Sequence, residues 1–572
     1  MCIDGSVSLR RVLLVPFLAV ACQVVGGIEV RDEFRPGAPS DGAGGDGAGG
    51  EGSEAGSGGA LSTAGSPGEA GAPGSAGEGT GGEPSQVVCG DGKKQGSETC
   101  DDGDENGEHG KCDASCLFVC DGECPIRVDP KISAAGNGKT WKTAFRSLQD
   151  AVDQQEEAGG GEVWVKTGTF AASGADTMLT LKSGVDVYGG FAGNELTRAE
   201  RDVPTVDRAT TLNANEVSTP AVVGDGVQHV TFDGFTVKNA VGAKGSAFQA
   251  TGSSDLTLSH VFFTDNGATA CGGAMWLENA EIRLLGGAFE DNHAGTTGGA
   301  ICAERATKLE IEGTRFVDND AVQRGGAIDA YGSYSPVAKP DVAIEAATFI
   351  GNRATREDEP SSGGGALYQM AGTLTIVDSD FKANSASLQS GAAVYLNDVA
   401  ADVYNSVFAE NEGFRTAFHT EFGGPVHIVG CTFAFNDVNC PGPCSVSGDA
   451  TVIENSLSVV SEKIQWPGFA SSVTTTMNCD VFTSGGLGSI ASPFGTAPLL
   501  DRDENGVEDY LLLVVPSADA QPCFHQGGDS VSDTAGIPWK SLTTSGNNCL
   551  DVSPVDVGRH YQPTNANPTA CE

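Results

Sequence analysis

A four-residue box, Phe-x-x-Asn, recurs through the middle of the sequence at a nearly constant spacing. Counted from Asn239, the Asn residues follow one another after 27, 26, 27, 33, 32, 27 and 25 residues. The boxes are Phe263–Asn266, Phe289–Asn292, Phe316–Asn319, Phe349–Asn352, Phe381–Asn384, Phe408–Asn411 and Phe433–Asn436. A fixed period in this range predicts a repeat protein, in which each unit buries its apolar face against its neighbours.

A second box follows five of the Phe-x-x-Asn boxes and begins with small residues. Its copies are GGAMW (272–276), GGAIC (298–302), GGAID (325–329), GGALY (364–368) and GAAVY (391–395). The two longer spacings between Asn residues contain polar insertions, which can leave from one corner without disturbing a strand.

This period suits a parallel β-helix. About 26 residues make one coil of three short strands, and each coil rises by one strand spacing of about 4.8 Å. We expect the Phe residues to stack in the interior and the Asn amides to bond the coils above and below from a turn. Paired Gly allows a tight corner, where a Cβ would clash or φ must be positive. The predicted fold is therefore all-β, a solenoid of three-stranded coils over residues 125–500.

A helix is expected before the first strands. Phe145, Leu148, Ala151 and Val152 recur at helical spacing, and the pattern stops at a Gly run. Strand-like segments follow at 163–170, 178–191 and 230–239. Such a helix would cap the solenoid by covering the unpaired edge of its first coil.

The two boxes resemble the GGA (followed by Ile or Leu) and FxxN repeats of chlamydial-type polymorphic outer-membrane proteins. Residues 126–560 also resemble bacterial pectin-lyase-like β-helix proteins. The similarity lies in the start, WKTAFRSLQDAV, VWVKTGTF and VYGGFAG, and in the end, PSADAQ and PVDVGRHY. This resemblance implies a right-handed parallel β-helix, but it leaves the function open because one fold hosts many functions.

The N-terminus predicts export. Arg10 and Arg11 precede an apolar run, 12–21, that is too short to span a bilayer and is typical of a signal peptide over 1–21. The residues from Ala19 to Cys22 resemble a bacterial lipobox, with Ala19 where Leu is usual. The resemblance implies acylation of Cys22 and an anchor at the outer membrane or cell surface of a Gram-negative bacterium. Ordinary cleavage after Ala21 is the alternative.

Two further segments separate this anchor from the solenoid. Residues 22–87 are rich in Gly, Ser, Ala and Pro and predict a disordered tether. Residues 88–124 hold six cysteines, Cys89, Cys100, Cys112, Cys116, Cys120 and Cys124. With few large apolar residues, this module needs two or three disulfides, whose connectivity stays open. It resembles the Cys-rich repeat of myxobacterial surface proteins; zinc bound by its last four cysteines is the alternative.

Other cysteines give separate expectations. Cys440 and Cys444 could close a tight loop, and Cys523, Cys549 and Cys571 could pair with one another or with Cys479 in the closing segment, 501–572. Cys271 and Cys302 are expected not to bond. They lie one coil apart but are offset by about five residues along the strand, which exceeds the reach of a disulfide.

Two acidic loops are candidate calcium sites. Their oxygen-bearing side chains alternate and a Gly holds the sixth position, a pattern that wraps a hard cation. The residues are Asp102, Asp104 and Asn106 in the first loop and Asp501, Asp503, Asn505 and Asp509 in the second. A solvated turn is the alternative for each loop. A column of Asp265, Asp291, Asp318 and Glu410 is interpreted as solvated turn residues rather than a shared cation site.

Charge and motifs bear on function. The chain carries 76 acidic and 33 basic residues, a net charge of −43, which opposes nucleic acid and anionic lipid and favours cations, basic surfaces or neutral glycans. Nucleophile elbow, P-loop and zinc-helix motifs are missing from the sequence. The best basic candidates are Arg415 and His419, beside Glu410 and Glu412, but no residue is assigned a catalytic role.

We therefore expect a cell-surface lipoprotein that recognises an extracellular glycan or surface protein without catalysis. It would contact the membrane through its lipid alone. The alternative is an extracellular polysaccharide lyase or glycoside hydrolase.

Overall fold

The computed structural model of the chain describes residues 124–460 with short gaps, and a few residues outside that range. The gaps are 175, 203, 206–208, 217–219, 333–337, 357–362, 388–390, 414–415, 423, 439–445, 448–450 and 455. The outlying residues described are 89, 93, 474–476, 479–482, 490–491, 541–542 and 560.

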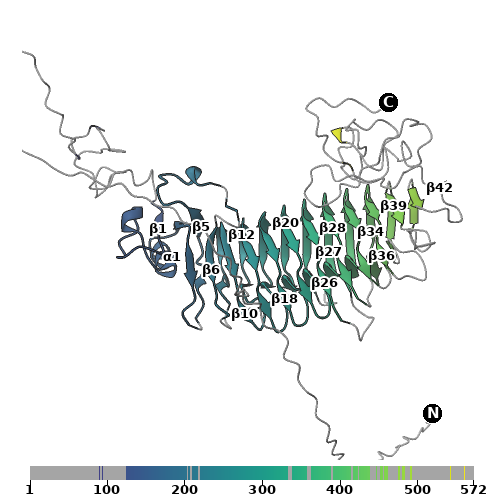
Figure 1. Cartoon of the computed structure of the whole chain (residues 1–572), viewed down its shortest axis with the longest axis horizontal. Helices are drawn as coiled ribbons and strands as arrows, with labels where there is room; N and C mark the ends of the chain where they lie inside the picture. Colours follow the sequence, from purple (N-terminus) through teal and green to yellow (C-terminus); the bar gives the residue numbers. More distant parts are fainter. Residues whose placement is uncertain are drawn as a thin grey trace, which may run out of the picture. The chain divides into compact units, whose positions relative to one another are not determined.

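The described strands form a right-handed parallel β-helix, as predicted (Figure 1). They build sheets of 21, 8 and 13 strands, and each strand pairs in parallel with the equivalent strand one coil away. The 21-stranded sheet contains two neighbouring stacks of strands, named here stack A and stack B. Two long strands, β27 (Leu367–Val377) and β30 (Val394–Tyr404), run through both stacks.

The other strands of stack A are β4 (Leu179–Thr180), β7 (Val222–Val223), β11 (Phe248–Thr251), β15 (Met275–Glu278), β19 (Ile301–Glu304), β23 (Ile328–Tyr331), β33 (Phe418–Glu421) and β37 (Val446–Ser447). Those of stack B are β1 (Ile126–Val128), β2 (Gly161–Lys166), β5 (Val185–Phe191), β8 (Gln228–Asp233), β12 (Ser254–Ser259), β16 (Glu281–Leu285), β20 (Lys308–Glu312), β24 (Asp341–Glu345), β34 (Val426–Val429), β38 (Thr451–Glu454) and β40 (Thr474–Thr476).

The 13-stranded sheet contains β3 (Thr169–Ala171), β6 (Thr210–Asn213), β9 (Phe235–Lys238), β13 (Phe262–Thr264), β17 (Ala288–Glu290), β21 (Arg315–Val317), β25 (Thr348–Ile350), β28 (Asp380–Lys382), β31 (Val407–Ala409), β35 (Thr432–Ala434), β39 (Leu457–Val460), β41 (Cys479–Phe482) and β42 (Ile490–Ala491). The eight-stranded sheet contains β10 (Val241–Gly242), β14 (Gly267–Ala268), β18 (His293–Ala294), β22 (Asp320–Ala321), β26 (Arg353–Ala354), β29 (Ser385–Ala386), β32 (Glu412–Gly413) and β36 (Asp437–Val438).

The interior is organised around the Phe-x-x-Asn boxes. The rings of Phe316, Phe349 and Phe381 are fully buried, and their centroids lie 4.6 and 4.5 Å apart in a nearly parallel stack. Phe263, Phe289, Phe408 and Phe433 extend the same column. Strand pairing sets this spacing, so each ring packs against one from the coil on either side.

The Asn residues form a buried ladder along the same edge. Nδ2 of Asn319 donates to Oδ1 of Asn352 at 2.9 Å and to the carbonyl oxygen of Phe289 at 2.8 Å. The same pattern runs from Asn266 to Asn411, and each amide donates towards the next coil in the sequence. The buried amides are thereby paired, which avoids the cost of a buried polar group without a partner.

Two glycines shape the four corners before stack A at 272–273, 298–299, 325–326 and 364–365. The first, such as Gly272 with φ +66°, is in the left-handed region, and a Cβ there would lie 2.1 Å from the carbonyl oxygen of Met275. A Cβ on the second, Gly273, would lie 2.1 Å from the carbonyl oxygen of Gly299 in the next coil. Gly326 and Gly365 continue this series of close approaches, and Ala392 takes the same position in the last box.

A helix covers the start of the solenoid. Helix α1 (Leu148–Glu157) begins after the Ser147 cap and buries Leu148, Ala151 and Val152 in the same core as the first strands. Phe145, which we expected on this helix, lies before it and forms a bridge with Val128 of β1. Two short 3-10 helices, η2 (Trp141–Thr143) and η3 (Arg198–Glu200), lie in the connections near this end.

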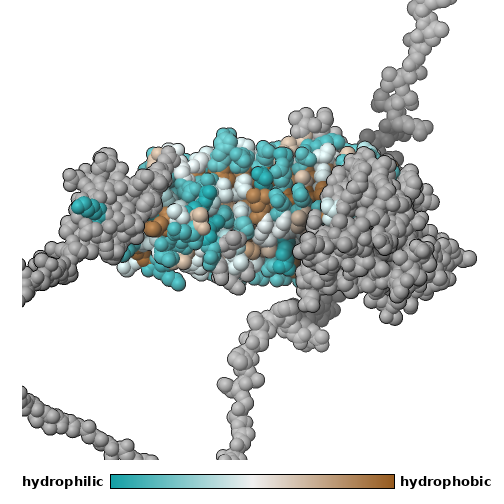
Figure 2. All heavy atoms as spheres, turned by 90° about the horizontal axis from the view of Figure 1, so that it is seen from above, coloured by the Kyte–Doolittle hydropathy of each residue, from teal (hydrophilic) through white to brown (hydrophobic). Residues whose placement is uncertain are grey.

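His560, a described residue of the closing segment, contacts the solenoid. The backbone N–H of His560 donates to Oδ1 of Asn405 at 2.6 Å, and Nδ2 of Asn405 donates to the carbonyl oxygen of His560 at 2.8 Å. On the face seen in Figure 2, the described surface is mostly hydrophilic and its hydrophobic residues form separate small patches.

Candidate functional site

The outward face of stack A carries aromatic, charged, amide and sulfur-containing side chains. Side chains alternate along each strand, so Met275 and Leu277 enter the core while Trp276 and Glu278 point outward. We name two adjacent outward columns the outer strip. One column contains Gln249, Trp276, Cys302, Asp329, Tyr368, Tyr395 and His419, and the other contains Thr251, Glu278, Glu304, Tyr331, Met370, Asn397 and Glu421.

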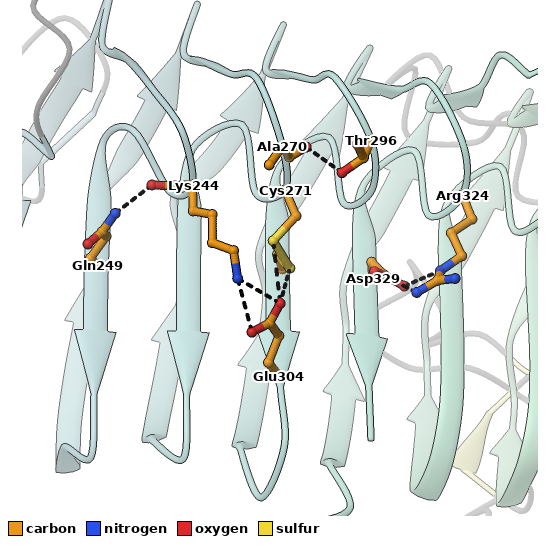
Figure 3. Close-up of a disulfide and its surroundings, with 9 residues drawn as sticks. Lys244, Gln249, Ala270, Cys271, Thr296, Glu304, Arg324 and Asp329 are labelled. Atoms are coloured by element: carbon orange, nitrogen blue, oxygen red, sulfur yellow. Dashed lines mark hydrogen bonds and ion pairs between the residues drawn. A yellow bond between two sulfur atoms is a disulfide. The ribbon is translucent and has the colours of Figure 1, made fainter. Parts of the chain in front are cut away.

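Corner residues reach over this strip. Lys244 precedes a corner glycine, and its Nζ points at Glu304 (Figure 3), 3.0 Å from Oε1. The same Nζ lies 4.7 Å from the centre of the Trp276 ring. The carbonyl oxygen of Lys244 accepts from Nε2 of Gln249 at 2.5 Å. The corner therefore holds a cation above an aromatic ring and pairs it with a carboxylate two coils away.

Cys271 and Cys302 form a disulfide, so the prediction that they do not bond is wrong. Their Cα atoms are 5.6 Å apart, within the usual range for a disulfide. The prediction counted the five-residue offset along an extended strand. The positive φ of Gly272 instead folds the chain back at the corner, so that Cys271 lies over the outer column one coil further on.

Glu304 lies beside this disulfide. Its Oε1 is 3.8 Å from Sγ of Cys271 and 3.9 Å from Sγ of Cys302. Two cysteines and a carboxylate in such proximity would suit a thiophilic metal if the sulfurs were thiolates. While the sulfurs are bonded to each other, they do not supply those ligands, and Glu304 pairs with Lys244 instead.

An ion pair occupies the centre of the strip. Nε of Arg324 donates to Oδ1 of Asp329 at 3.0 Å, and the side chains are 22% and 2% exposed. The guanidinium lies 4.5 Å from the ring centre of Tyr368 and 5.1 Å from that of Tyr331. Burial alone would lower the pKa of Arg324, but the charge and hydrogen bonds of Asp329 raise it above its ordinary value. The rings and carboxylate together fix the plane of the guanidinium.

A stack of rings continues the strip. Tyr368 and Tyr395 are nearly parallel with centroids 5.4 Å apart, and the His419 ring follows at 5.0 Å. The hydroxyl of Tyr395 donates to Oε2 of Glu421. His419, a predicted basic candidate, thus lies beside a tyrosine–carboxylate pair. Glu412, expected beside it, belongs to β32 in a different sheet.

The expected column of acidic turn residues is present in part. Asp265, Asp291 and Asp318 have positive φ in consecutive coils, and Glu410 occupies the same turn further on. The pKa of Asp291 is raised, first by burial and then by the charges of Asp318 and Asp265, while Arg353 opposes the shift.

A Ser–His–Asp group elsewhere has the wrong geometry for a catalytic triad. Nδ1 of His260 is 2.9 Å from Oγ of Ser259 and 3.6 Å from Oδ1 of Asp233. A triad uses the two different ring nitrogens for these two contacts. Asp233 is instead held by Arg201, whose Nη2 lies 2.7 Å from Oδ2.

Many predicted site residues lie outside the described residues. These are Cys22, both candidate calcium loops, Arg415, Cys440, Cys444, Cys523, Cys549, and Cys100, Cys112, Cys116 and Cys120 of the Cys-rich module. Of that module, Cys89 and Cys124 are described, and each is in a disulfide bond.

Sequence reasoning missed Lys244, Trp276, Glu304, Arg324 and Asp329. A signal was available in the second box, whose early positions are small or apolar. Its fifth letter varies among Trp, Cys, Asp and Tyr, and this letter is the first column of the outer strip.

Among the comparisons with known proteins, the match to a family model supports the fold. Residues 207–408 match the family model described as the right-handed β-helix region. No match was found among curated proteins. Among solved structures, the chain is similar to PfbA, a surface adhesin of Streptococcus pneumoniae, at 13% identity and a TM-score of 0.34, covering 68% of this chain and 100% of that chain.

Two further similar structures are enzymes. A rhamnogalacturonan lyase has 13% identity and a TM-score of 0.38, with 62% of this chain and 87% of that chain covered. The A-module of Azotobacter vinelandii mannuronan C-5 epimerase AlgE4 has 14% identity and a TM-score of 0.29, with 64% and 100% covered. These likenesses concern the fold alone.

Across the part of the chain that the structure describes, no helix combines the length and apolar character that crossing a bilayer requires.

Proposed function

We propose that this chain is a cell-surface recognition protein that binds an extracellular glycan, free or carried by a surface protein, through the outer strip. The supporting observation is the strip itself. It presents Trp276 on one coil, and Tyr331 with the Arg324–Asp329 pair on a second coil two strand spacings away. Aromatic faces beside a few oriented polar groups suit sugars, which have both apolar and hydroxylated surfaces.

Repetition supports binding to a polymer. A chain molecule lying along the strip would meet side chains from several coils at a regular spacing, and weak contacts made together gain strength through multivalency. The net charge of −43 keeps nucleic acid from being a plausible partner.

A glycan array probed with the full chain tests this proposal. We expect retention on at least one extracellular polysaccharide, and we expect Trp276→Ala combined with Tyr331→Ala to weaken it. Phe422→Ala is the matched control, because Phe422 is 73% exposed but lies outside the strip. Binding that the control weakens as much as the double variant would contradict the assignment to the outer strip.

A second candidate is a polysaccharide lyase or glycoside hydrolase. The observation that favours it is the Tyr395–Glu421 pair beside His419, because a phenol, a carboxylate and an imidazole can exchange protons. Incubation with acidic and neutral polysaccharides, with and without calcium, would then release unsaturated or reducing ends. Product formation that Tyr395→Phe or His419→Ala abolishes would establish this candidate in place of recognition alone.

The proposal includes export and lipidation at Cys22, followed by a tether over 22–87. Cys22→Ser should move the protein from the membrane fraction to the soluble fraction, since an acyl chain contributes about 0.8 kcal/mol per buried CH₂. A membrane-bound Cys22→Ser variant, together with a wild-type protein that carries no fatty acid, would rule lipidation out.

A further inference from the structure

We infer that the outer strip selects a neutral glycan over a polyanionic one and holds a sugar unit at Arg324 and Tyr331. This inference rests on the proposed function and adds the chemical class of the ligand to it.

The first step concerns the cations that reach the strip. In the described residues, Lys244 is paired with Glu304, Arg305 with Glu278, and Arg324 with Asp329. The strip also carries Glu421, whose partner is a neutral phenol. Among the described residues, four carboxylates therefore face three Lys or Arg cations here. A polyanion gains affinity from cations that lack such internal partners, and an acidic protein repels it further.

The second step concerns the donors that remain. Nε and Nη2 of Arg324 face Asp329, and among the described residues Nη1 has no acceptor. Asp329 is too covered to touch a ligand, so we assign it the role of positioning the guanidinium. The ion pair then offers N–H groups with little net charge, which suits the hydroxyl oxygens of a neutral sugar.

The third step concerns the aromatic surface. Tyr331 is 41% exposed, one of the most exposed large hydrophobic side chains of the described residues. Arg324 lies against its ring, and the exposed part can pack against the C–H face of a pyranose. Tyr368 and Tyr395 are almost fully buried, so they support the guanidinium and the stack rather than offering a free ring.

The experiment uses two polymers with the same backbone. Polygalacturonate carries a carboxylate on every unit, and its carboxyl-reduced form is neutral; a mannan and a β-glucan complete the neutral set. Binding of the full chain is measured by affinity electrophoresis at low and high NaCl. We expect a neutral polymer to bind, polygalacturonate to bind at least about tenfold more weakly, and the neutral affinity to be unchanged by salt.

Variants locate the site. Arg324→Lys and Tyr331→Ala should each weaken neutral binding by about tenfold, the size of effect expected from a central contact residue. Arg283→Lys is the matched control, because Arg283 pairs with Glu310 at 3.1 Å on the outward face of stack B. Thermal unfolding of each variant checks the fold, and exposed Tyr331 keeps the test valid if Arg324→Lys fails to fold.

The outcomes distinguish glycan recognition, the proposed function, from the selection of a neutral glycan, the further inference. Tighter binding of polygalacturonate, or neutral binding that Tyr331→Ala leaves unchanged, overturns the inference while glycan recognition stands. Binding of no polymer in this set or on the array overturns the proposed function together with the inference.

Discussion

Nε of Arg324 lies 3.0 Å from Oδ1 of Asp329, five residues further along the same coil and across its glycine corner. The same five-residue relationship joins the carbonyl oxygen of Lys244 to Nε2 of Gln249. The left-handed Gly325 and Gly245 turn the chain back in both cases. The residue before each of these corner glycines is therefore a neighbour of the outer strip, although it lies five residues earlier in the sequence, on the other side of the corner.

The stacked Phe rings should dominate the stability of the solenoid. Phe349→Ala removes a ring packed between Phe316 and Phe381, and we expect a loss of about 3–5 kcal/mol in the free energy of unfolding. Denaturant unfolding measures it. Phe422→Ala, at a ring 73% exposed, is the control and should change stability by less than about 0.5 kcal/mol. Equal losses in the two variants would contradict the assignment of Phe349 to the core.

The Cys271–Cys302 disulfide should stabilise the corner it closes. The bond joins residues 31 apart, and its loss in Cys271→Ala/Cys302→Ala should cost about 2–4 kcal/mol. Unfolding of the wild type and of the double variant is measured with and without a thiol reductant. Both proteins are needed because other disulfides in the chain also respond to reduction. The wild type should lose more stability on reduction than the double variant does. An identical loss in both proteins would mean that these two cysteines are not bonded.

Asp291 should make part of the stability depend on pH. Its pKa is raised in the folded state, so between the unfolded and folded pKa values the folded protein binds more protons than the unfolded one. The free energy of unfolding should therefore rise as the pH falls through that interval. Asp291→Asn should weaken this dependence, and Asn tolerates the positive φ at this position. If the variant has the same pH profile of the unfolding free energy as the wild type, Asp291 is not the source of this pH dependence.

Calcium binding is predicted for the loop that contains Asp501, Asp503, Asn505 and Asp509. Calorimetry of the full chain with calcium should record binding, and Asp503→Ala should weaken it because one carboxylate ligand is lost. The other candidate loop, with Asp102, Asp104 and Asn106, calls for a separate variant, Asp104→Ala. If neither variant changes calcium binding, the ion binds elsewhere. If calorimetry of the wild-type chain records no heat of calcium binding, both predicted sites are wrong.

The interior of the solenoid was predictable because its residues repeat. Phe316 and Asn319 occupy positions that every coil must fill in the same way, so their spacing carries the architecture. The outer strip was less predictable because Trp276, Cys302 and Asp329 share a position but no chemistry. No packing rule demands one residue type on a column that points away from the core, and only its place in the second box indicates this column.

The wrong prediction for Cys271 and Cys302 has a specific physical origin. Distance along a strand is a sound measure only while the backbone stays extended. Gly272 has φ +66°, and the resulting reversal replaces a separation of several strand residues by a Cα–Cα distance of 5.6 Å. Paired glycines in a sequence should therefore be treated as points where the two flanking residues approach each other.

The second glycine of the paired-glycine corners has a consequence for how coils can be added to or removed from such a chain. Gly273, Gly299 and Gly326 each fit closely against the same corner in the following coil, so these coils are mutually compatible neighbours. One of them can be duplicated or lost, and the flanking coils still meet a corner of the shape they require. Ala392 takes that position in the final box and marks the end of the interchangeable series. Under the proposed function, the number of such coils would set how many contacts a glycan polymer can make along the outer strip.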